Sequence, residues 1–171
     1  MRSSESGFTL DDIMKSSNKL SYYLEELSAT TDQASYHGLP ASHKALRLAY
    51  AAQGIVGNGG FRYFYELRDD PSDVAWAFRH IGLPEAAAVE ESMRPFPAGM
   101  LEGRPRMLDA HWTECITWMD THRKELEISW DKTERVIMDL SNKSTQDPGD
   151  ILETCTRKFI LQHLDEFVFK E

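Results

Sequence analysis

LAYAAQGIVGNGGFRYFYEL, residues 48–67, is the segment that decides the fold. Its first half continues an apolar stripe with the three- and four-residue spacing of an α-helix that packs by one face, formed by Ala45, Leu48, Ala49, Ala52, Ile55 and Val56. We predict a helix over about 41–56. The residues Gly57-Asn58-Gly59-Gly60 end it, because they readily adopt the left-handed backbone conformation that closes helices. The aromatic stretch 61–67 then predicts a second, short helix.

Helix signals continue on both sides of this segment. Downstream, Asp70-Pro71 pairs an N-cap residue with proline at the first helical position, and Gly82 ends that helix. Pro84 opens the next helix, which Pro95 and Pro97 break. Upstream, residues 9–12 (TLDD) fit a capping box, and the apolar spacing up to residue 27 fits either one long helix or two short ones.

The C-terminal third also has helical spacing. Apolar residues at 107–122 and 126–140 predict two helices, although the alternation at 126–130 also fits a short strand. A turn-rich stretch, 141–149, precedes Asp150, which caps a last helix up to about residue 167. No series of Val- and Ile-rich strands occurs. We therefore predict an all-α, single-domain orthogonal assembly of about seven or eight short helices over 9–171, after a flexible N-terminus, 1–8.

The composition excludes several classes of protein. The 171 residues include 19 basic and 28 acidic side chains, a net charge of −9. This balance argues against direct nucleic-acid binding and against adsorption to an anionic membrane, while it permits a basic protein partner. Two cysteines, no signal-peptide pattern and no apolar run of membrane-spanning length lead us to expect a cytoplasmic protein.

The candidate chemical motifs all have simpler structural explanations. The glycine-rich stretch 54–60 lacks the Lys-Ser/Thr of a phosphate-binding loop and follows a helix rather than a strand. His111, Cys115 and His122 share a helix face, but zinc needs about four ligands, and the same face carries Trp112, Trp118 and Met119 as a core stripe. We identify no catalytic, cofactor-binding or metal-binding residue, and no motif supports enzymatic activity.

The acidic residues are the remaining candidates for function. The densest local group is Glu66, Asp69, Asp70 and Asp73, and Glu90 and Glu91 follow within the next helix. We take these six as candidate interaction residues. Part of the group has a structural explanation as well, since Asp70 and Asp73 fall where a helix N-terminus favours carboxylates. Glu90 also has Arg94 four residues later, the spacing of an ordinary helical ion pair.

Residues 48–97 resemble the bacterial DNA-mimic-protein-like domain family, long described as a domain of unknown function. The resemblance rests on a helix that ends in Asn58-Gly59-Gly60-Phe61, on the Ala-Phe-x-x-Ile-Gly pattern that ends at Ile81 and Gly82, and on Phe96-Pro97. Family members often have glutamine after that phenylalanine, where this chain has Arg62. The resemblance implies an all-α fold and a protein that is often dimeric. It also implies that one studied relative presents an acidic surface that imitates the phosphates of duplex DNA and so occupies a transcription factor.

Three hypotheses follow. The first is a non-enzymatic acidic protein-interaction module, a DNA mimic that sequesters a basic DNA-binding protein. The second is an accessory or immunity-like protein that caps a partner by shape, which requires an exposed apolar patch. The third is an enzyme or small-ligand binder, which requires a pocket around Asn58, Tyr63 and a histidine.

Overall fold

The computed structural model describes residues 7–29, 38–67, 69–83, 85–104, 107–139 and 151–170. Over these ranges the fold is all-α, as predicted, and contains no strand. The helices are α1 (Leu10–Lys15), α2 (Ser17–Ala29), α4 (Ala41–Glu66), α5 (Pro71–Ile81), α6 (Ala86–Met93), α7 (Asp109–Thr121), α8 (Arg123–Met138), α9 (Ile151–Gln162) and the 3₁₀ helix η2 (Leu164–Glu166). None of these helices is long and apolar enough to cross a membrane.

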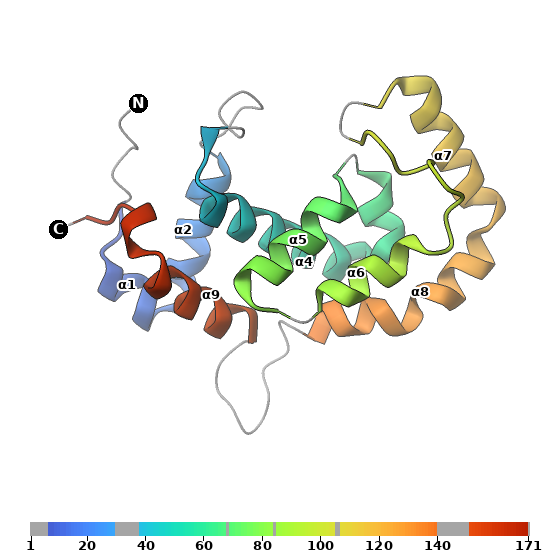
Figure 1. Ribbon diagram of the computed structural model, residues 1–171. Helices are drawn as coiled ribbons and strands as arrows, with labels where there is room; N and C mark the ends of the chain where they lie inside the picture. The colour runs from blue at the N-terminus through green and yellow to red at the C-terminus, as the bar shows by residue number, and fades with distance from the viewer. Residues whose placement is uncertain are drawn as a thin grey trace.

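The helices form two groups joined by α4 and α5 (Figure 1). At one end α1, α2 and α9 lie together, and Arg157 of α9 donates from Nε to the carbonyl of Ile13, 3.1 Å away. At the other end α6, α7 and α8 surround the second half of α4. A continuous core of buried apolar side chains connects the two groups.

Helix α4 bends sharply at Gly60. The backbone there has φ +67° and ψ −172°, a conformation that L-residues rarely adopt. The predicted turn between two helices is therefore confirmed. Its predicted position is wrong by about two residues, because the first helix continues through Gly57 and Asn58 instead of ending there. The aromatic helix begins at Phe61 and ends at Glu66.

A carboxylate from a distant helix caps the start of the aromatic helix. Glu134 of α8 accepts a hydrogen bond from the Phe61 N–H at 2.6 Å, which satisfies a donor that the bend leaves without a helical partner. The same carboxylate occupies the space beside Gly60, since a Cβ placed on Gly60 would lie 2.5 Å from Glu134 Oε1. The bend therefore requires glycine for its backbone conformation and for the close approach of α8.

The aromatic helix carries the densest part of the core. The Tyr65 ring stacks on Trp130 with 5.4 Å between the centroids and lies 4.7 Å from Phe96. Both polar groups of this pair are satisfied at Ser92, because the Tyr65 hydroxyl lies 2.8 Å from Ser92 Oγ and the Trp130 indole N–H donates to the Ser92 carbonyl at 2.9 Å. These contacts fix α6 and α8 against the second half of α4.

Several local predictions are confirmed. Thr9 and Asp12 form the capping box of α1, Asp70 accepts from the Ser72 N–H at 2.9 Å to cap α5, and Gly82 ends α5 in the left-handed conformation. The segment up to residue 27 is two helices, separated at Ser16.

The alternative prediction of a short strand at 126–130 is wrong, because these residues lie within α8. The helix starts expected at Pro84 and Asp150, the turn-rich stretch 141–149 and most of the flexible N-terminus fall outside the described residues.

The bend at Gly60 gives a first prediction. Replacing Gly60 with alanine should lower the free energy of unfolding by about 2 kcal/mol or more, because the backbone conformation is strained for alanine and the methyl group would collide with Glu134. Urea denaturation followed by circular dichroism measures this change.

The matched control is Gly54→Ala. Gly54 lies within the helical part of α4, and a Cβ there would have no neighbour within 4 Å. This substitution should raise stability by about 0.5–1 kcal/mol, because alanine favours helix more than glycine does. Equal effects of the two substitutions would contradict the assigned role of Gly60.

Candidate functional site

The site is organised by a buried arginine. Arg104 is only 2% exposed, and its guanidinium donates to the carbonyls of Tyr65, Leu67 and Asp69. Its Nη1 also points to the Cys115 sulfur of α7, 3.7 Å away. One side chain therefore connects the end of α4, the approach to α5, the loop after α6, and α7.

The surroundings compensate the buried charge of Arg104. The carbonyls at the C-terminus of a helix carry partial negative charge, and Tyr65 and Leu67 provide two of them at the end of α4. The guanidinium carbon also lies 4.9 Å from the Trp112 ring centroid and 5.6 Å from that of Tyr65, within the range of cation–π attraction. The arginine thus presents its charge to the interior.

We call Arg104 with its three carbonyl contacts the arginine clamp. Two adjoining cavities lie between the elements that this clamp joins, and both open to solvent. One, of about 640 Å³, lies between α7 and the loop after α6, and the other, of about 400 Å³, lies between the same loop and the start of α5. They share the wall formed by residues 97–99, 102 and 103. We call the pair the acidic hollow, because the carboxylates of Asp70, Glu102 and Glu114 line it.

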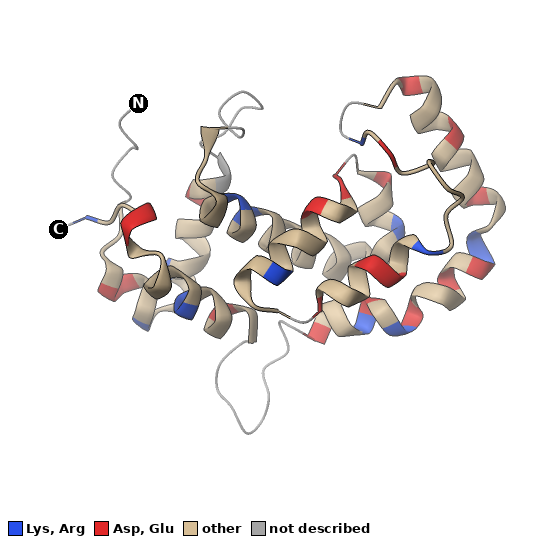
Figure 2. Ribbon diagram, in the orientation of Figure 1, with Lys and Arg blue, Asp and Glu red and all other residues tan. Residues whose placement is uncertain are grey.

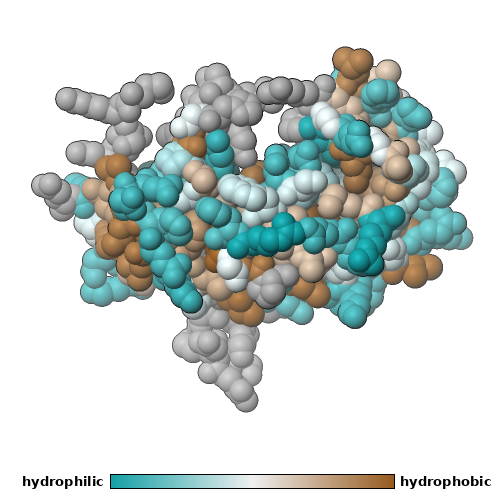
Figure 3. All heavy atoms as spheres, viewed as in Figure 1, coloured by the Kyte–Doolittle hydropathy of each residue, from teal (hydrophilic) through white to brown (hydrophobic). Residues whose placement is uncertain are grey.

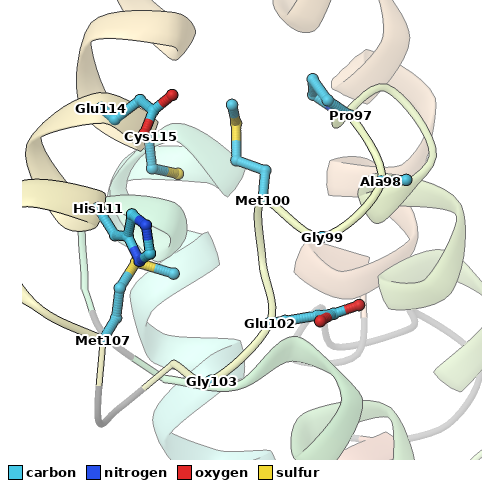
Figure 4. Close-up of a pocket in the computed structure, with 10 residues that line it drawn as sticks. All are labelled: Pro97, Ala98, Gly99, Met100, Glu102, Gly103, Met107, His111, Glu114 and Cys115. Atoms are coloured by element: carbon cyan, nitrogen blue, oxygen red, sulfur yellow. The ribbon is translucent and has the colours of Figure 1, made fainter.

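The larger cavity brings sulfur-containing side chains close to α7 (Figure 4). Met100 extends from the loop between α7 and Pro97, and the Cys115 sulfur points toward it. His111 and Met107 lie at the other end of the cavity. Burial raises the pKa of the Cys115 thiol, and the nearby Arg104 offsets this only in part. The thiol is therefore neutral at pH 7, which does not favour a nucleophile.

The carboxylates at the acidic hollow have no cationic partner among the described residues. Asp73, one helical turn beyond Asp70, is exposed on α5, and Glu102 and Glu114 are exposed on the loop and on α7. Partial loss of solvent around its base, and then the like charge of Asp70, raise the pKa of the Asp73 carboxyl. Burial also raises the pKa of Asp69, and Arg104 and Arg47 only partly counteract it. The ionised forms of Asp69 and Asp73 are thus less favourable here than in water.

The other predicted interaction residues lie in ion pairs. Glu66 accepts from Arg62 at 2.7 Å, Glu90 pairs with Arg79 across α5 and α6, and Glu91 lies 2.8 Å from Arg94. The six predicted acids therefore separate into two sets. Asp70 lines the acidic hollow, with Asp69 next to it in the chain and Asp73 one helical turn later, whereas Glu66, Glu90 and Glu91 are balanced by arginines.

The charge distribution differs between neighbouring helices (Figure 2). Helix α7 carries Asp109, Glu114 and Asp120 and contains no lysine or arginine, whereas α8 alternates acidic and basic residues. Asp120 pairs with Arg62 of α4 at 2.9 Å. The end of the molecule formed by α7, the loop before it and the start of α5 is therefore richer in acids than the face along α8.

The first two parts of the family motif lie away from the hollow and act on the fold, whereas Phe96 and Pro97, the third part, line the hollow. Gly59 and Gly60 allow the bend, and Phe61 is fully buried beneath it. Ile81 is buried, and Gly82 ends α5. Backbone geometry and packing account for these two parts of the motif.

The other residues considered for metal binding or catalysis do not come together at one site within the described part of the chain. The described residues contain no group of three or more His, Cys, Asp or Glu side chains placed to hold a metal ion. His111 is exposed and lines the larger cavity, Cys115 is buried, and the His122 ring bonds to the Trp118 carbonyl. Asn58 and Tyr63 line neither cavity, so the pocket anticipated around them is not one of these two.

Sequence reasoning missed four residues that matter here: Arg104, Glu102, Glu114 and Glu134. Arg104 and Glu134 form hydrogen bonds with residues 11 to 73 positions away in the chain. Glu102 and Glu114 line one cavity, although they come from different segments. No local pattern could have identified them.

The fold and site define a class: an all-α protein that carries an acidic hollow beside a buried arginine clamp. The family model described as DMP19-like protein matches residues 37–163. The chain therefore belongs to the DMP19-like protein family. No curated protein and no solved structure matches the chain at a significant level.

The arginine clamp gives a second prediction. Arg104→Met should lower the free energy of unfolding by about 3 kcal/mol, because it leaves three buried or half-buried carbonyls without their donor. Arg104→Lys should lose less, since an ammonium can still reach some of these carbonyls. Urea denaturation measures both.

Arg94→Met is the control, because Arg94 forms an exposed ion pair with Glu91. Its cost should stay below about 1 kcal/mol. The clamp would be refuted if Arg104→Met unfolded at the same urea concentration as the control.

Proposed function

We propose that this protein is a non-enzymatic, acidic protein-interaction module, a DNA mimic that sequesters a basic DNA-binding protein. One observation carries the proposal: Asp70, Glu102 and Glu114 line the acidic hollow from three separate segments, Asp73 follows one helical turn after Asp70 on α5, and no ion pair among the described residues involves any of the four. Membership of the DMP19-like family and the net charge of −9 support it.

The physical basis is the substitution of carboxylates for phosphates. A DNA-binding surface attracts phosphate through clustered lysine and arginine side chains, and much of its affinity comes from released counterions. Carboxylates held on packed helices can make the same contacts without losing conformational freedom on binding. The contacts of Arg104 and the aromatic core hold the elements that carry these acids.

The unfavourable setting of two carboxyls adds support. The pKa of the half-buried Asp69 is raised by burial, and that of Asp73, whose side chain is exposed, is raised by partial desolvation at the helix surface and by the like charge of Asp70. A cationic side chain from a partner would restore the favourable interaction that water provides elsewhere. Acidic groups in such positions are candidates for function.

Glu66, Glu90 and Glu91 have a secondary place in this proposal. Each is already neutralised by an arginine of the same molecule, so a partner would have to compete with an existing ion pair. Their contribution to affinity should accordingly be small.

A shape-based interaction is the alternative, and exposed apolar residues favour it. Leu108 and Ile128 are 73% and 80% exposed, at the start of α7 and in α8. On the face in Figure 3, however, the hydrophobic residues form small separate groups among hydrophilic ones. A partner whose binding is unaffected by salt but abolished by Leu108→Ser or Ile128→Ser would support this alternative.

The proposal predicts salt-dependent binding. Purified basic DNA-binding proteins from the same organism would be tested with labelled duplex DNA as competitor. At least one should bind, its affinity should fall steeply as salt rises from about 0.05 to about 0.5 M, and the protein should displace the duplex.

The variant Asp73→Asn/Glu102→Gln/Glu114→Gln should weaken this binding by about tenfold or more and reduce its salt dependence. Glu125→Gln, which neutralises an exposed acid of α8, is the control and should bind as the wild type does. Salt-independent affinity, or equal binding by the triple variant, would refute the DNA-mimic proposal.

Binding should also depend on pH with a definite sign. A cationic partner stabilises the ionised carboxylates, so affinity should be full above the raised pKa values of Asp69 and Asp73 and should decline as pH falls through them, above their ordinary value of 3.8. The substitution Asp73→Asn should flatten the decline. Isothermal titration calorimetry across this range measures it, and an affinity that rises on acidification would contradict it.

The homodimer implied by the family resemblance stays a prediction. Sedimentation velocity at several protein concentrations tests it.

A further inference from the structure

The acidic hollow combines its carboxylates with an apolar lining that a simple imitation of DNA does not require. Met93, Phe96 and Leu101 line the smaller cavity, and Met100 and Met107 line the larger one. Phosphates on duplex DNA present charge alone to a binding protein. The apolar lining indicates a partner that brings apolar side chains together with its cations.

Methionine is suited to such a partner. Its unbranched thioether side chain adapts to differently shaped apolar groups and is common on surfaces that bind several peptides. Met100 is half-buried on a loop that has glycines with positive φ at 99 and 103, and its side chain reaches into the larger cavity (Figure 4). The apolar surface can therefore adjust to its ligand.

The charges around the lining define the rest of the ligand. Asp70, Glu102 and Glu114 surround the two cavities, and α7, which forms one side, contains no lysine or arginine. The buried Arg104 directs its charge toward backbone carbonyls. Cationic groups that flank an apolar anchor would meet carboxylates on both sides of the shared wall.

We infer that the acidic hollow binds a basic amphipathic helix of a protein partner, with the apolar face of that helix on Met100 and its lysines and arginines on Glu102, Glu114 and Asp70. This inference rests on the proposed function and adds to it the chemistry of the recognised segment. A helix that presents apolar anchors at i, i+3, i+4 and i+7 fits a groove of this kind.

The test uses the full chain and two fluorescently labelled peptides of about 18 residues, long enough for several helical turns. The first contains leucine on one face and lysine and arginine on the other. The second has the same composition in an order that destroys the two faces. Fluorescence anisotropy should show one peptide bound per protein, with the amphipathic peptide binding about tenfold more tightly. Equal affinity of the two peptides would overturn the inference.

Two substitutions locate the binding. Met100→Gln should weaken binding of the amphipathic peptide by about fivefold or more with little change in salt dependence, because it removes apolar contact and no charge. Glu102→Gln/Glu114→Gln should weaken binding and reduce the salt dependence. Met138→Gln, at a half-buried position of α8, and Glu125→Gln are the matched controls and should bind as the wild type does. Retained binding in Met100→Gln would overturn the inference.

The outcome separates this inference from the proposed function. If a DNA-binding protein is bound with salt dependence and loses affinity in the acid variant but not in Met100→Gln, the DNA mimic stands and the amphipathic helix does not. If neither variant alters binding of that protein, both fail.

Discussion

The contact of the Arg104 guanidinium with the carbonyls at the end of α4 holds the candidate site together. This one side chain joins the end of α4 and the approach to α5 to α7. A cation in the interior is tolerated because helix-end carbonyls and two aromatic rings replace water around it. The loop that carries Arg104 also carries Met100 and Glu102, so the clamp determines where the acidic hollow forms.

The bend at Gly60 has the corresponding role for the core. It directs the aromatic helix between α6 and α8, where Tyr65 and Trp130 share Ser92 as their polar partner. Glu134 compensates the broken helix by accepting from the Phe61 N–H. Backbone geometry and packing therefore explain the glycines and Phe61 of the family motif, and none of the acids proposed to bind a partner belongs to that motif.

Acidic residues that are close in sequence do not all lie together in the folded protein. Glu66 stands near Asp69 and Asp70 in the chain, yet its carboxylate pairs with Arg62 one helical turn earlier. Glu102 and Glu114 are far from Asp70 in sequence but line cavities that share a wall with it. Net charge indicated a basic partner. The position of the unpaired charge depended on which arginines lie within reach of each carboxylate.

The sequence by itself determined the helices, most of their ends and the turn near Gly60, because apolar spacing, N-caps and glycine or proline signals act over a few residues. It did not determine that Glu134 caps Phe61, that Arg104 is buried, or that Met100, Met107 and three carboxylates surround one hollow. Those features depend on contacts between segments far apart in the chain. Only the packing of the helices against each other decides which distant side chains meet.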